Sequence, residues 1–242
     1  LDELWAVFTE SPGGDVLQYG NPARYPLARR VLERAHAIVV HNQTSAIQLA
    51  EMGFGPKVHV IPLLYYEDQV MSVRQADSSA LRSNLGFTEA EIVIGMFGFI
   101  GPTKRIDKVF RAVRTILDET PNLSVRILIV GEGARLTDAI CSHGLRDIVI
   151  ETGFVPESKF LEIMNTVDIV ANLRYPSMGE SSASLFQAMS LGKPVIVTNH
   201  GSFAELPDNA VVKVSYGSEE ILEIAGALKL VIESREERER LA

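Results

Sequence analysis

The chain has 242 residues, 46% of them hydrophobic and 22% charged, a balance typical of a globular protein with one large domain or two modest ones. Its formal net charge of -8 argues against a surface that binds nucleic acid or anionic membranes, because both require clustered Lys and Arg. The single cysteine, Cys141, excludes an intramolecular disulfide, and no apolar run is long enough to predict a transmembrane segment.

Residues 1–65 contain few predicted elements: one strand over Ala37–His41, one helix over about Thr44–Met52 and the short extended piece "KVHVIP". These are too few to close a sheet. We therefore expect residues 1–65 to be the C-terminal part of an incomplete α/β domain whose earlier part precedes the chain, with a linker at residues 63–77. We expect a cytoplasmic protein, in which that N-terminal domain is the part that could reach a membrane surface.

Residues 66–242 are predicted to form one complete α/β domain. Its apolar runs do not alternate with polar residues, which is typical of parallel strands buried on both faces. These runs are Ile92–Ile100, Val125–Val130, Ile148–Ile150, Asp168–Leu173 and Pro194–Val197. Segments of helical period separate them; in "TKRIDKVFRAVRTILDETPN" apolar residues recur at three and four, and Pro121 ends the segment. The alternation predicts a Rossmann-like, doubly wound parallel sheet.

The turn after the first strand of this domain, "GMFGFIGPTKRID", combines glycines with cations. Gly98 and Gly101 keep the backbone open, Thr103 is the expected helix N-cap, and Lys104 and Arg105 are expected in the first helical turn. Cations there oppose the helix dipole, and a bound dianion would reverse that preference. The alternative is that both side chains point into water.

A second glycine turn, "LIVGEGARL", follows the next strand. Gly131 and Gly133 resemble the start of a dinucleotide fingerprint, and Glu151 stands at a suitable distance downstream. Leu136 replaces the third glycine, which disfavours a nicotinamide site. The alternative is a tight turn that needs glycine for its backbone alone.

In the third segment, "MGESSASLFQAMSLGKP", a helix is predicted over about Ser181–Leu191, with Gly192 as its left-handed cap. Small residues at its start would let a phosphate approach the free amide groups of the first turn. These residues are Ser181, Ser182 and Ser184. Glu180 either complements the helix dipole as a surface acid or contacts a ligand beside the anion.

In this order and spacing, "GFIGPTKRID", "LIVGEGARL", "TGFVPESKFLEIMNTVDIVANLR" and "GESSASLFQAMSLGKPVIV" resemble the donor-binding domain of the retaining glycosyltransferases of family 4, with the GT-B fold. The resemblance implies two Rossmann-like domains, of which the C-terminal one binds a nucleotide-diphosphate sugar of UDP or GDP type. It implies sugar transfer to an acceptor hydroxyl with retention, and neither a cofactor nor a metal ion. The acceptor stays unknown. The chain has no Asp-x-Asp motif, and its histidines lack metal-ligand spacing.

The resemblance also assigns roles to single residues of the first and second turns. Lys104 matches the lysine that contacts the donor diphosphate, and Phe99 replaces an arginine beside Gly98, so that Arg105 is the candidate substitute. Phe154 and Val155 lie in the segment whose main chain reads the nucleobase. The donor-binding turn at Gly131 and Gly133 completes this part of the predicted site.

In the third segment, Glu180 matches the glutamate that contacts the donor sugar, and Gln187 replaces the glutamate that binds the ribose, with six residues between them instead of seven. Lys104 and Glu180 are the candidate catalytic residues, since cations and the amides of Ser181 and Ser182 would stabilise the departing diphosphate. Because Phe99 and Gln187 depart from the family pattern, a nucleotide-sugar-binding module without catalysis is the alternative.

Overall fold

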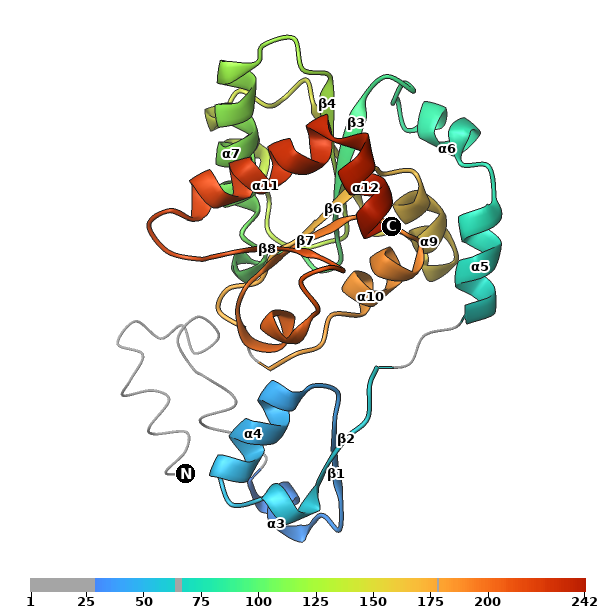
Figure 1. Cartoon of the computed structure of the whole chain (residues 1–242). Coiled ribbons are helices and arrows are strands. Elements are labelled where there is room, and N and C mark those ends of the chain that lie inside the picture. The colour runs from blue at the N-terminus through green and yellow to red at the C-terminus, as the bar shows by residue number, and fades with distance from the viewer. Residues whose placement is uncertain (1–28, 64–66, 178) are drawn as a thin grey trace. The chain divides into compact units, whose positions relative to one another are not determined.

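The protein is described by a computed structural model that covers residues 29–63, 67–177 and 179–242, in two compact units (Figure 1). Unit 1 comprises the described residues within 1–64 and 176–181, and unit 2 those within 65–175 and 182–242. The part of the predicted N-terminal domain that precedes Arg29 lies outside the described residues, and so do residues 64–66 of the predicted linker. In the ranges that are described, no helix has the length and apolar character needed to cross a membrane.

Unit 1 contains a two-stranded parallel sheet and the expected helix. Asn42 caps that helix, since its Oδ1 accepts a hydrogen bond of 2.7 Å from the backbone N–H of Ser45. The elements are α3 (Arg29–Arg34), β1 (Ile38–Val40), α4 (Gln43–Glu51), the 3-10 turn η1 (Gly55–Lys57) and β2 (Val58–Val60). The strand and helix predicted here are thus present, with ends shifted by one residue.

Unit 2 alternates strands and helices along the chain, as its sequence pattern predicts. Its strands are β3 (Ile92–Phe97), β4 (Val125–Val130), β5 (Val149–Gly153), β6 (Ile169–Asn172), β7 (Val195–Thr198) and β8 (Val212–Val214). Its helices are α5 (Glu67–Gln75), α6 (Ser79–Asn84), α7 (Ile106–Glu119), α8 (Thr137–Ser142), α9 (Glu157–Asn165), α10 (Ala183–Ser190), α11 (Glu220–Glu233) and α12 (Arg235–Leu241). Two 3-10 turns, η2 (Pro102–Lys104) and η3 (Gly201–Glu205), complete it.

The six strands of unit 2 form one parallel sheet in the order β5-β4-β3-β6-β7-β8. This is the strand order of the Rossmann fold, in which the chain first winds outward to one side and then returns to wind to the other. The order reverses between β3 and β6, which pair directly. The predicted doubly wound α/β fold is confirmed.

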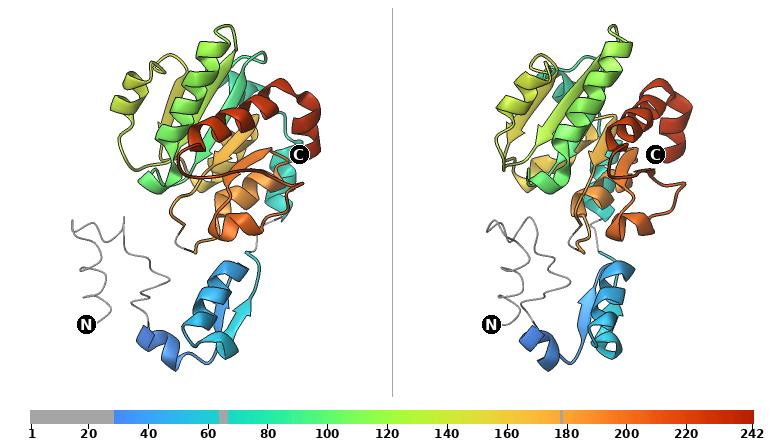
Figure 2. Two further views of the ribbon diagram at one scale, coloured as in Figure 1. Left: turned by 60° about the vertical axis from the view of Figure 1, so that its left-hand side comes forward. Right: turned by 90° about the vertical axis from the view of Figure 1, so that its left-hand side faces the viewer.

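Helices cover both faces of this sheet (Figures 1 and 2). Along β3, Ile94 and Met96 face the core shared with α7 and α11, whereas Val93 and Phe97 face the core shared with α9 and α10. Side chains of successive residues in a strand point to opposite faces, so a strand buried on both faces must be apolar throughout. This requirement explains the uninterrupted apolar runs of the sequence.

Several predicted boundaries are wrong for local backbone reasons. β3 ends at Phe97 rather than at residue 100, because the chain turns at Gly98, whose φ is 90°. The predicted linker over residues 63–77 contains α5. Thr103 is not a helix N-cap, since it lies within η2 and α7 begins after Arg105.

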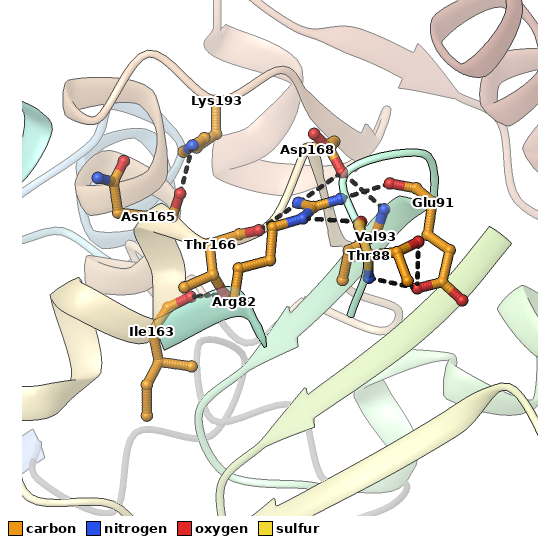
Figure 3. Close-up of polar contacts among 9 residues, drawn as sticks. All are labelled: Arg82, Thr88, Glu91, Val93, Ile163, Asn165, Thr166, Asp168 and Lys193. Carbon is orange, nitrogen blue, oxygen red and sulfur yellow. Dashed lines mark hydrogen bonds and ion pairs between the residues drawn. The ribbon is translucent and has the colours of Figure 1, made fainter. Parts of the chain in front are cut away.

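At the amino edge of the sheet, a polar network joins α6 and the end of α9 to β3 (Figure 3). The buried Arg82 of α6 donates to the carbonyl oxygens of Thr88, Glu91 and Thr166 and, at 3.0 Å, to the carboxylate of Asp168. Asp168 also accepts a bond of 2.7 Å from the backbone N–H of Val93. A buried guanidinium is costly unless it is bonded in this way, so the network fixes how these elements pack.

We predict that Asp168→Ala destabilises the protein by about 2–3 kcal/mol, because it removes a charged acceptor from Arg82 and leaves the Val93 N–H without its bond. Urea denaturation measures the change in the free energy of unfolding. The matched control is Asp118→Ala on α7, which breaks an exposed i,i+4 pair with Arg114 and should cost less than about 0.5 kcal/mol. Equal losses in the two variants would contradict the role given to the network.

Candidate functional site

The carboxyl edge of the unit 2 sheet, at the point where the strand order reverses, is the candidate site. In open α/β sheets the loops that follow the two strands at this point diverge and leave a crevice in which ligands bind. In this chain those strands are β3 and β6. The loop after β3 carries the turn with Lys104, and the loop after β6 begins at Leu173 and returns to unit 2 at Ser182.

The glycine turns after β3 and β4 are in direct backbone contact. The N–H of Gly98 donates to Val130 O at 2.8 Å, and the N–H of Ala134 donates to Ile100 O at 2.7 Å. A β carbon on Gly131 would lie 2.1 Å from Gly98 O, and one on Gly133 would lie 2.1 Å from Ile100 O. Gly131 and Gly133 are therefore required by the close approach of the two backbones. This agrees with the alternative given in the sequence analysis, a tight turn that needs glycine for its backbone alone.

Lys104 is the buried cation of this edge. Only 8% of it is exposed, and its Nζ donates to the carbonyl oxygen of Phe97 at the end of β3. A β carbon on Gly98 would lie 3.2 Å from Nζ, so the glycine leaves the space beside the ammonium open. Burial, and secondly the charge of Arg174, lower the pKa of Lys104 to about 7. An anion placed here would relieve both effects.

Arg174 is a site residue that sequence reasoning missed. It follows β6 directly, and its positive charge acts on Lys104 across the point where the strand order reverses. Its backbone N–H donates to Thr198 Oγ1 at 3.0 Å, which fixes the chain at this place. The available signal was its position, because a cation immediately after a buried strand lies at the ligand-binding edge of a parallel sheet.

Arg105 is engaged inside the protein. Its Nε donates to Glu220 Oε1 at 2.9 Å, and its Nη2 forms an ion pair with Glu220 Oε2. Its φ of 57° is left-handed, which costs a residue with a β carbon about 1–2 kcal/mol. It is the N-cap of α7, so the expectation that Lys104 and Arg105 occupy the first helical turn is wrong.

Two of the predicted serines take part in a small buried polar cluster. Ser182 is the N-cap of α10, and its Oγ accepts from the N–H of Leu185 at 3.3 Å. Ser182 and Ser184 both donate to Asn172 Oδ1 at the end of β6, at 3.4 Å. Their hydroxyls are thus hydrogen-bonded within the fold, and the start of α10 offers backbone N–H groups at this edge.

Other predicted residues are exposed or lie deeper. Phe99 is 75% exposed and Phe154 is 68% exposed, after β3 and β5 respectively. Val155 packs against the core on the α9 and α10 side. Gln187 lies within α10 and is half-buried. The two phenylalanine rings are apolar surfaces at the same edge of the sheet as Lys104.

Glu180 and Ser181 belong to unit 1, through the short segment 176–181. Glu180 Oε2 accepts a hydrogen bond of 3.2 Å from Ser177 Oγ. Asn42, the cap of α4, donates to Gly179 O at 2.9 Å and to Ser181 Oγ at 3.0 Å. These bonds attach segment 176–181 to the rest of unit 1. Of the two predicted catalytic residues, Glu180 therefore lies in unit 1 and Lys104 in unit 2.

A cavity of about 250 Å³ lies at the opposite, amino edge of the sheet, around Arg82, Asp168 and Lys193 (Figure 3). Lys193 donates to Asn165 O at 2.8 Å, and Arg82 is bonded as described above. Because Arg82 and Lys193 are already bonded to carbonyl oxygens, and Arg82 also to Asp168, the residues around the cavity are part of the structural network. Across residues 29–63, 67–177 and 179–242, no three or more His, Cys, Asp or Glu gather where they could hold a metal ion.

Comparison with known protein families identifies the family to which the chain belongs. Residues 77–242, well over half of the chain, match the family described as "Glycosyl transferases group 1". The chain belongs to this family. The matched region begins before α6 and runs through all six strands of unit 2.

Curated relatives of this glycosyl transferases group 1 chain are glycosyltransferases. It is 24% identical over 222 residues to D-inositol 3-phosphate glycosyltransferase of Nocardia farcinica, covering 88% of this chain and 48% of that protein. It is 26% identical over 235 residues to 2-deoxystreptamine glucosyltransferase of Streptomyces kanamyceticus, covering 94% and 59%. The chain therefore spans about half to six-tenths of the length of these relatives.

Solved glycosyltransferase structures share the fold. Anabaena HepE, solved with UDP and glucose, superposes with a TM-score of 0.77 at 20% identity, over 96% of this chain and 62% of that one. WaaG, a glycosyltransferase of lipopolysaccharide biosynthesis, superposes with a TM-score of 0.72 at 15% identity, over 84% and 55%. At these identities the likeness establishes the fold of this glycosyl transferases group 1 chain.

Unit 2 thus brings together part of the predicted site. Gly98, Gly131 and Gly133 meet at one edge, and Lys104 reaches the first of these turns. Arg105 is instead paired with Glu220.

We predict that Gly131→Ala destabilises this glycosyl transferases group 1 chain by about 3 kcal/mol, since the new β carbon would overlap Gly98 O and the backbone must shift. Thermal unfolding followed by circular dichroism measures the loss. The control is Gly153→Ala, where φ is also left-handed at 69° but no atom lies within 4 Å of the new β carbon. It should cost only about 1–2 kcal/mol. A Gly131 variant as stable as the Gly153 variant would contradict the close contact.

Proposed function

We propose that this chain is the donor-binding part of a glycosyltransferase that uses a UDP-sugar. The observation that carries the proposal is the buried Lys104 at the carboxyl edge of β3, held near the charge of Arg174. Two cations that repel each other at a buried edge favour a bound dianion, because it attracts both. Family membership supports a nucleotide-diphosphate sugar as that dianion, and HepE, with the same fold, was solved with UDP.

The chemistry assigned to this edge is stabilisation of the leaving group. When the bond between the sugar and the diphosphate breaks, its electron pair stays on the diphosphate and negative charge grows there. Lys104 and Arg174, together with backbone N–H groups at the start of α10, are the donors for that charge. Removal of one such preorganised donor typically raises a barrier by about 2.7–4 kcal/mol.

The other roles follow from the sequence resemblance and are part of the proposal. Glu180 contacts hydroxyls of the donor sugar, and Gln187 contacts the ribose through its amide group. The main chain at Phe154 and Val155 contacts the nucleobase. The reaction is transfer to an acceptor hydroxyl with retention at the anomeric carbon, as in family 4, and the donor is held without a metal ion.

We predict that the purified chain binds UDP in the presence of EDTA, and that Lys104→Met weakens this binding about tenfold to hundredfold, since a charge-assisted bond contributes about 1.5–3 kcal/mol. Isothermal titration calorimetry measures the dissociation constant. Lys229→Met is the matched control, because Lys229 lies on α11 and pairs with the exposed Glu119 at the far end of α7. Its UDP affinity should stay unchanged.

Equal affinities of the Lys104 variant and the unaltered chain would contradict the role of Lys104, and binding only with an added divalent cation would contradict the metal-free site. The alternative of a binding module without catalysis is separated by incubating UDP-glucose with the full-length protein, since the donor-binding part alone is not expected to turn over, and measuring UDP release. A transferase releases UDP by transfer or slow hydrolysis, whereas a pure binding module releases none.

We also predict that affinity for UDP-glucose decreases as pH rises above 7. Lys104 binds the diphosphate as a cation, and its pKa in the free protein is lowered to about 7, first by burial. Affinity is therefore fully present below this pKa and falls by up to about tenfold for each pH unit above it, until the pKa of the bound state is reached. Calorimetry between about pH 6 and pH 8.5 measures the profile, because the diphosphate diester keeps its charge there.

The Lys104→Met variant is the control for this profile, since it has no ammonium to titrate. Its weaker affinity should stay flat over the same range. An unaltered chain with a flat profile would contradict the titration of Lys104.

A further inference from the structure

Arg105 has an unusual backbone for its residue type. Among the described residues it alone has a positive φ without being glycine. It stands between η2, which ends at Lys104, and α7, so its conformation sets the direction in which the chain leaves the Lys104 turn. A residue with a β carbon holds such a conformation only where its surroundings enforce it.

Glu220 supplies that constraint from a distant part of the chain. It is the first residue of α11 and is only 2% exposed. Both of its carboxylate oxygens bond the Arg105 guanidinium, one to Nε and the other to Nη2. This two-point pairing fixes the plane and position of the guanidinium, and the start of a helix also favours the carboxylate.

A second set of contacts holds the same turn from the loop after β6. The Arg105 guanidinium lies 5.7 Å from the ring centre of Tyr175, and this ring stacks on Tyr216 at 4.1 Å. The backbone N–H of Tyr175 donates to Thr103 O at 2.8 Å. The Lys104 turn is thus bonded on both sides, to the loop after β6 and to α11.

We propose that Glu220 is a positioning residue for the diphosphate site: it holds Arg105 in its left-handed conformation, and so keeps Lys104 where its ammonium meets the donor diphosphate. This inference rests on the proposed function. It assigns Arg105 a role different from that of a diphosphate ligand, because Glu220 already neutralises its charge and occupies two of its donor groups. The prediction that Arg105 contacts the donor is replaced by an indirect role.

The test compares UDP with uridine, which share the base and ribose but differ in the diphosphate. The variants are Glu220→Gln and the double variant Glu220→Gln with Arg105→Gly. We expect Glu220→Gln to weaken UDP about threefold to tenfold and leave uridine unchanged, since only the diphosphate meets Lys104. In the double variant, glycine adopts the left-handed conformation unaided, so UDP affinity should return to near that of the unaltered chain.

Uridine affinity also reports whether each variant is folded. If Glu220→Gln fails to fold, the double variant alone decides, since it lacks both charges and should still bind UDP. A double variant that binds uridine but has lost UDP overturns the inference, because Arg105 would then be a direct ligand of the diphosphate. An unchanged ratio of UDP to uridine affinity in Glu220→Gln also overturns it. No UDP binding by the unaltered chain would overturn the proposed function itself, and the inference with it.

Discussion

Backbone contact between the turns after β3 and β4 is the constraint on which the carboxyl edge depends. The carbonyl oxygens of Gly98 and Ile100 occupy the space in which β carbons of Gly131 and Gly133 would lie. Hydrogen bonds between these turns, such as Gly98 N to Val130 O at 2.8 Å, hold them together. Because Gly98 has no side chain, the space beside the end of β3 stays open, and Lys104 can reach back to the carbonyl oxygen of Phe97.

The fold could be predicted from the sequence because its determinants are local and repetitive. A strand between two helical layers must be apolar at every position, and β4 shows this from Val125 to Val130 with one exception, Arg126. Likewise α7 buries the stripe that its spacing predicts, including Val109, Phe110 and Val113. Periodicity reports which faces of an element are buried, and in a doubly wound sheet that information nearly determines the architecture.

The side-chain partners within the site could not be predicted in the same way. The sequence places Arg105 beside Lys104 and says nothing of Glu220, which stands 115 residues later in the chain, after the last strand of the sheet. The sequence predicted that the Ser182 hydroxyl would be available to a ligand, whereas in the folded chain it caps α10 and bonds Asn172. Residue type and spacing reveal which groups could bind an anion; which of them are already bonded within the protein depends on three-dimensional packing.

In unit 2 the Arg82 network and the candidate site lie at opposite ends of the strands, which has a practical consequence for protein engineering. The charged groups of the network lie at the amino ends of the strands, and the glycine turns and Lys104 lie at the carboxyl ends. Substitutions chosen to raise thermostability can therefore be confined to the Arg82 end, while libraries that aim to alter the proposed donor site can be confined to the Lys104 end. Interactions at well-separated positions combine nearly additively, so gains made at one end should carry over to variants selected at the other.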